Sequence, residues 1–140
     1  MGHCISVYLI KKEDLRDEKI SEVLDGKKQT KIVWTDLKEG ILATPILPDI
    51  REFGKDKTIA KIETDYFGGC GSQSAKLFVN NKKIYNESNE QDFKLKPINT
   101  ALKMMSIVTK DGMDEFDTIG LGNYRSNRDF KHVESEIGEL

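Results

Sequence analysis

The chain has 140 residues, of which 33% are charged and 37% hydrophobic. This length is typical of one domain, so we expect residues 1–140 to form a single domain. A net charge of −2 without a long Lys/Arg run argues against a nucleic-acid-binding protein. No segment approaches the roughly 20 apolar residues that a transmembrane helix needs. We therefore expect no membrane span and a cytoplasmic location.

The first residues allow two interpretations. The start Met1-Gly2-His3-Cys4-Ile5-Ser6 fits the myristoylation pattern M-G-x-x-x-[ST], which fixes only two positions after the Met. The segment Ile5–Ile10 is apolar and β-branched, which predicts a buried first strand. Because a buried strand leaves little free tether for a lipid anchor, we expect a strand here.

The next segment is rich in charge. Ile20, Val23 and Leu24 share one helical face and Leu15 lies near it, and Gly26 suits the C-terminal cap of a helix. We therefore predict an amphipathic helix over residues 12–25, with its charged face in water.

A series of antiparallel strands is predicted to follow. Residues 31–37 are rich in β-branched and aromatic residues, which predicts a strand. Residues 41–44 are its expected hairpin partner, after a short turn that contains Gly40. The prolines at positions 45 and 48 restrict residues 46–50 to a sheet edge or a loop.

The clearest strand is Thr58–Phe67, in which apolar and charged residues alternate. The alternation resumes over Ala75–Val79, and Asn80-Asn81 predicts a tight turn before a strand at Lys83–Asn86. We predict an antiparallel meander over residues 58–86 with one face in water.

The C-terminal part contains the remaining helical signals. Pro97 and the apolar residues after it predict a helix that ends at Gly112, and Asp114–Ile119 predicts a short further helix. From about residue 123 we expect an irregular tail. The chain is thus predicted to be an α+β domain, with a mainly antiparallel sheet of about five to six strands and two main helices packed on one face.

The glycine-rich segment between two predicted strands is the candidate binding site. Three glycines in four residues remove side-chain cover and leave backbone N–H groups, hydroxyls, an amide and a thiol close together. We predict an exposed loop that binds a ligand or partner, formed by Asp65, Tyr66, Phe67, Gly68, Gly69, Cys70, Gly71, Ser72 and Gln73. A purely structural hairpin connection is the alternative.

Cys70 is the one candidate nucleophile in this loop. Cys70-Gly71-Ser72 overlaps with the pattern around papain-type cysteines, but Gln73 and the residue after it depart from that pattern. A thiolate needs a nearby base or cation, for which His132 is the candidate. A hydrolase or transferase that uses Cys70 with His132 is therefore the alternative function, with Ser72 or backbone N–H groups as oxyanion donors.

No metal and no cofactor are expected. The two cysteines and two histidines lack the spacing of a zinc site. The acidic residues between positions 111 and 117 depart from the spacing of a calcium loop, and the glycines depart from phosphate-binding motifs.

The leading functional hypothesis is a small non-catalytic binding or neutralising protein that acts through a protein–protein surface. A toxin-immunity protein is one instance that suits this size and charge. The surface would combine the loop at residues 65–74 with Lys61, Glu63 and Lys76 on the water-facing side of the meander. A third possibility is a subunit whose sheet edge pairs with a second copy.

Overall fold

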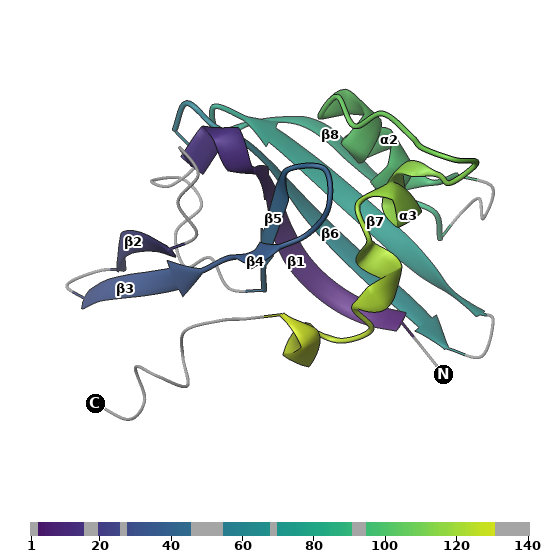
Figure 1. Ribbon diagram of the computed structural model, residues 1–140, viewed down its shortest axis with the longest axis horizontal. Coiled ribbons are helices and arrows are strands. Elements are labelled where there is room, and N and C mark those ends of the chain that lie inside the picture. The colour runs from purple at the N-terminus through teal and green to yellow at the C-terminus, as the bar shows by residue number, and fades with distance from the viewer. Residues whose placement is uncertain are drawn as a thin grey trace.

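The fold is built on one six-stranded antiparallel sheet. The computed structural model describes residues 3–15, 20–25, 28–45, 55–67, 70–90 and 95–130. The strand order is β4-β5-β1-β6-β7-β8 (Figure 1). The strands of this sheet are β1 (His3–Lys11), β4 (Thr35–Asp36), β5 (Ile41–Thr44), β6 (Thr58–Phe67), β7 (Cys70–Val79) and β8 (Lys82–Ser88).

One face of this sheet is buried against the helices. Ile5, Val7 and Leu9 alternate along β1 and point into the core, which they share with Ile62 of β6 and Leu77 of β7. The helices α2 (Pro97–Met104) and α3 (Glu115–Thr118) cover this face (Figure 1). The α+β architecture with a mainly antiparallel sheet and two helices, predicted from the sequence, is confirmed. No helix in the described ranges has the length and apolar character needed to cross a bilayer.

The helix predicted over residues 12–25 is wrong. Its first residues form the 3-10 helix η1 (Lys12–Leu15), and β2 (Ile20–Asp25) pairs with β3 (Lys28–Val33) in a separate ribbon. The ribbon register sets Glu22 opposite Lys31 and Asp25 opposite Lys28, so residues of opposite charge occupy facing positions. Cross-strand pairing therefore outweighs the helical spacing of Ile20, Val23 and Leu24.

The opposite face of the sheet is buried at one end only. Ile10 lies opposite Leu42 in β5 and Ile59 in β6, and all three side chains are fully buried although they point away from the core described above. This second apolar layer occupies the end of β1 that follows Tyr8. The other end of the same face carries polar residues.

The segment after α3 closes the free edge of β1. β5 pairs with β1 only from Tyr8 onward, so the start of β1 needs other partners. The Cys4 N–H donates to the Arg125 carbonyl at 2.8 Å, and the Ser6 N–H donates to Asn127 Oδ1 at 2.9 Å. The segment contains the 3-10 helices η2 (Leu121–Asn123) and η3 (Asn127–Asp129). Of the irregular tail expected from about residue 123, residues 131–140 lie outside the described residues.

Helix α2 ends earlier than the sequence predicts. Ser106 takes a φ of 70°, the Ser106 N–H donates to the Lys103 carbonyl, and the Ile107 N–H donates to the Leu102 carbonyl. These two bonds and the left-handed residue define a Schellman motif, which stops the helix well before Gly112. Ile107 and Leu102, the positions that usually make the hydrophobic contact of this motif, are both buried in the core cluster.

Replacing the left-handed serine should stabilise the protein. Ser106→Gly removes the steric cost of a Cβ in this conformation, so we expect the free energy of unfolding to rise by about 0.5–1 kcal/mol. Urea unfolding followed by circular dichroism measures this change. Thr109→Gly, at an exposed position whose φ is not positive, is the control and should be neutral or destabilising. An equal gain in both variants would contradict the assignment.

Candidate functional site

The predicted glycine-rich loop is mostly paired strand. The β6–β7 ladder runs continuously from Thr58↔Val79 to Phe67↔Cys70. Gly68 and Gly69 lie outside the described residues. The expectation of a wide loop over residues 65–73 is therefore corrected, because all of the described part belongs to β6 or β7.

Strand alternation divides the predicted binding residues between two faces. Tyr66, Gly71 and Gln73 belong to the face that the helices cover, as do Thr64 and Ala75 next to them. Asp65 and Ser72 lie opposite each other on the other face. Phe67 and Cys70 are placed only as backbone in β6 and β7, since their side chains fall outside what is described. Among the nine predicted residues, those whose side chains are described therefore do not share one face.

Gln73 is used inside the fold. Its Oε1 accepts from the Ile98 N–H at 2.9 Å at the start of α2, where Lys96 provides no side-chain cap. Its Nε2 donates to the Tyr66 hydroxyl at 3.0 Å, and its own N–H donates to Oδ1 of the buried Asn89 at 2.8 Å. The Gln73 side chain, on β7, therefore caps α2, and its amide group is not free to bind a partner.

Gly71 is required by close backbone packing. Its φ is 143°, and a Cβ at this position would lie 1.9 Å from the carbonyl oxygen of Asp65. Only glycine fits this approach without movement of the backbone. Gly71 thus supports the alternative interpretation, in which the glycines have a structural role in the hairpin connection.

The first site variant tests this constraint. Gly71→Ala should lower the free energy of unfolding by more than about 2 kcal/mol, because the clash is with backbone and cannot be relieved by a side-chain rotation. Chemical denaturation gives the value. Gly122→Ala, where a Cβ meets no atom closer than 3.6 Å, is the control and should change stability little. Equal stability of Gly71→Ala and the parent protein would refute the close approach.

The second site variant tests the capping role of Gln73. Gln73→Ala leaves the Ile98 N–H without its partner, so we expect a loss of about 1–3 kcal/mol in unfolding free energy. The neighbouring Ser72→Ala, on the opposite face, should cost less than about 0.5 kcal/mol. Thermal unfolding of the two variants side by side makes the comparison. If both variants lose the same stability, Gln73 has no special role.

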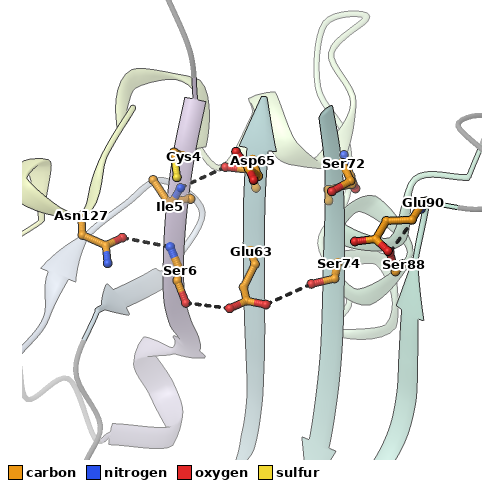
Figure 2. Close-up of a pocket in the computed structure, with 12 residues that line it drawn as sticks. Cys4, Ile5, Ser6, Glu63, Asp65, Ser72, Ser74, Ser88, Glu90 and Asn127 are labelled. Atoms are coloured by element: carbon orange, nitrogen blue, oxygen red, sulfur yellow. Dashed lines mark hydrogen bonds between the residues drawn. The ribbon is translucent and has the colours of Figure 1, made fainter. Parts of the chain in front are cut away.

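The polar side of the sheet, here called the open face, carries a cavity of about 360 Å³ (Figure 2). The open face consists of Cys4, Ser6 and Tyr8 of β1, Lys61, Glu63 and Asp65 of β6, Ser72, Ser74 and Lys76 of β7, and Asn86 and Ser88 of β8. All of these residues are exposed or half-buried. The side of the meander predicted to face water is confirmed.

Glu63 lies at the centre of the cavity. The register sets Ser6, Glu63, Ser74 and Ser88 in one row across four strands. The Ser6 hydroxyl donates to one oxygen of Glu63 at 3.1 Å, and the Ser74 hydroxyl donates to the other at 3.3 Å (Figure 2). Hydroxyls on both flanks therefore hold the carboxylate over the middle of the sheet.

Two further elements complete the cavity wall, and sequence analysis missed both. Asn127 of η3 lies beside β1, where its Oδ1 accepts from Ser6, and Glu90 follows β8 with its N–H donating to the Ser88 hydroxyl at 3.2 Å. Asn127 is placed by a capping box in which Ser126 and Asp129 exchange hydrogen bonds. The spacing of Ser126 and Asp129 resembles a capping signal and was the available clue.

Charge changes sign along the open face. Asp65 and Glu63 occupy successive rows, and the next row holds Lys61 beside Lys76. Lys61 is fixed there, since its Nζ lies 4.6 Å from the centroid of the Tyr8 ring and donates to the Tyr8 hydroxyl at 3.4 Å. One end of the face is therefore acidic and the other basic, with the cavity at the acidic end.

The described residues do not place a nucleophile beside a base, as the catalytic alternative requires. His132 lies outside them, and Cys70 is placed only by its backbone. Cys4 is an exposed thiol at the cavity, and no histidine is among the described lining residues. His3 instead points away, with its Nε2 donating to the Leu121 carbonyl at 3.1 Å. No group of three His, Cys, Asp or Glu suited to a metal ion occurs in the described part of the chain.

Comparisons with known proteins identify no relative. No family model matches the chain, and no curated protein and no solved structure shows significant similarity to it.

Proposed function

We propose that the chain is a small non-catalytic binding or neutralising protein that acts through a protein–protein surface formed by its open face. The observation that carries this proposal is the cavity of about 360 Å³ over β1, β6, β7 and β8, on the side opposite the helices. The acidic end predicted as part of the binding site, Asp65 and Ser72, lines this cavity. Gln73 also lines the cavity, although its side chain, like Tyr66 and Gly71, lies on the face that the helices cover.

The lining favours a protein partner over an apolar small molecule. Sites for small molecules of this size are mostly apolar, with a few polar groups that set orientation. Here the described lining contains four serines, three carboxylates and only one aliphatic residue, Ile5, whose side chain points into the core. A polar surface of this kind resembles the rim and wet contacts of protein–protein interfaces.

The charge pattern indicates what such a partner presents. Carboxylates at Glu63 and Asp65 attract a basic group, while Lys61 and Lys76 in the next row attract an acidic one. Successive rows on one face of a strand are about 7 Å apart. A partner with opposite charges at this separation would be steered to one orientation, and the reversed orientation would bring like charges together.

Substitutions on the open face test the proposal. The tagged protein and its variants are used to capture proteins from extracts of the source cells, and captured proteins are quantified by mass spectrometry. We expect one protein to be captured by the parent chain and to fall at least tenfold with Ser72→Arg, which fills the cavity, and with Lys76→Glu, which inverts the basic row.

Matched controls lie on exposed positions of the other side. Thr109→Arg and Lys103→Glu repeat the same changes of size and charge away from the open face and should leave capture unchanged. A partner retained by both open-face variants, or lost equally in the controls, would contradict the proposal. So would the absence of any captured protein.

A further inference from the structure

We propose that the cavity on the open face receives the guanidinium group of an arginine side chain from the protein partner. This inference rests on the proposed function and specifies the chemistry of its central contact. It depends on the direction of the hydrogen bonds at Glu63, on the charges around the cavity and on the spacing of its acceptors.

The floor of the cavity presents hydrogen-bond acceptors. The Ser6 and Ser74 hydroxyls direct their protons to Glu63, so each of these oxygens offers lone pairs toward a ligand. The ionised carboxylate has about four acceptor positions, and the two serines use two of them. A ligand that bonds this row must therefore bring several donors of its own.

The charge of the cavity selects a cationic donor. Glu63, Asp65 and Glu90 line it, while the described lining contains no Lys, Arg or His side chain. The nearest cation along β6, Lys61, lies one row away and is held over the Tyr8 ring. A cationic group from outside would thus find three carboxylates that no lysine or arginine of the lining offsets.

The placement of the acidic residues favours an organic cation over a metal ion. No group of three His, Cys, Asp or Glu residues that could hold a metal ion occurs in the described part of the chain.

The row of acceptors across the strands distinguishes arginine from lysine. A planar guanidinium has five donors in a rigid fork and can reach acceptors on Ser6, Glu63 and Ser74 together. An ammonium is a compact point charge that reaches fewer of them.

The test uses N-acetyl-arginine methylamide as the probe, followed by amide chemical shifts at low salt. We expect saturable shifts at residues of the cavity, with affinity at least tenfold higher than for N-acetyl-lysine methylamide. Glu63→Gln should weaken binding of the arginine probe at least tenfold. Glu87→Gln makes the same charge change on β8, opposite Ala75 and so on the other face, and should leave the affinity unchanged.

Three results would overturn the inference. Equal affinity for the two probes would show simple charge attraction, and unchanged affinity in Glu63→Gln would remove the central contact. The third concerns the source of the guanidinium. An extended peptide with Arg and Asp two residues apart should bind more tightly than the single residue, because its carboxylate reaches the row of Lys61 and Lys76. If methylguanidinium alone binds as tightly as the peptide, the ligand is a small molecule and not a partner's arginine.

These results are separable from the test of the proposed function. Loss of partner capture in Lys76→Glu, together with no binding of the arginine probe, would overturn this inference and leave the proposed function standing. Binding of the probe without any captured protein would overturn the proposed function and the assignment of the guanidinium to a partner.

Discussion

The register of β1, β6 and β7 is the constraint on which the rest of the structure depends. Side chains alternate between the faces of a strand, so a slip of one residue would exchange the buried and the polar sets. Val7, Ile62 and Ala75 share one row and are fully buried, while Ser6, Glu63 and Ser74 share the adjacent row on the other side. Burial of one row therefore fixes the position of the other, because each buried aliphatic side chain of Val or Ile size contributes about 1.5–3 kcal/mol. The open face is thus aligned by the core behind it.

Specific contacts hold the β6–β7 hairpin at one side of this ladder and the free edge of β1 at the other. Gly71 allows β6 and β7 to approach closely near their hairpin, and Gln73 joins that end to the start of α2. On the opposite edge, residues 125–127 supply the backbone partners that β5 does not give to β1. Such contacts pair N–H groups that would otherwise lower the stability of the fold or bind the strand of another chain. They also bring Asn127 to the cavity, far from Glu63 in sequence.

Local patterns were sufficient for the sheet and insufficient for the site. Alternation over Thr58–Phe67 identified both faces of β6 correctly, because period-two burial is a direct signature of a half-exposed strand. The helix expected at residues 12–25 is wrong, since the pairing of β2 with β3 depends on a partner strand that a single segment does not reveal. The glycine-rich segment suggested exposure, but composition does not distinguish a loop from a close backbone approach such as that of Gly71. Ser6, Ser74 and Ser88 meet only through cross-strand register, and serines in separate strands carry no sequence signal of that meeting.

The serine–glutamate row adds little to stability, and its proposed role is in recognition. Hydrogen bonds between exposed side chains add little to folding, since water competes for both partners. Their effect at Glu63 is conformational: two short hydroxyls with few rotamers restrain a longer side chain that would otherwise lose mobility when it bound a ligand. Restraint that is already present in the free protein lowers the entropy cost of association. A carboxylate fixed between hydroxyls, above a core that fixes the strands themselves, is consequently better suited to bind a specific donor group than one on a mobile loop.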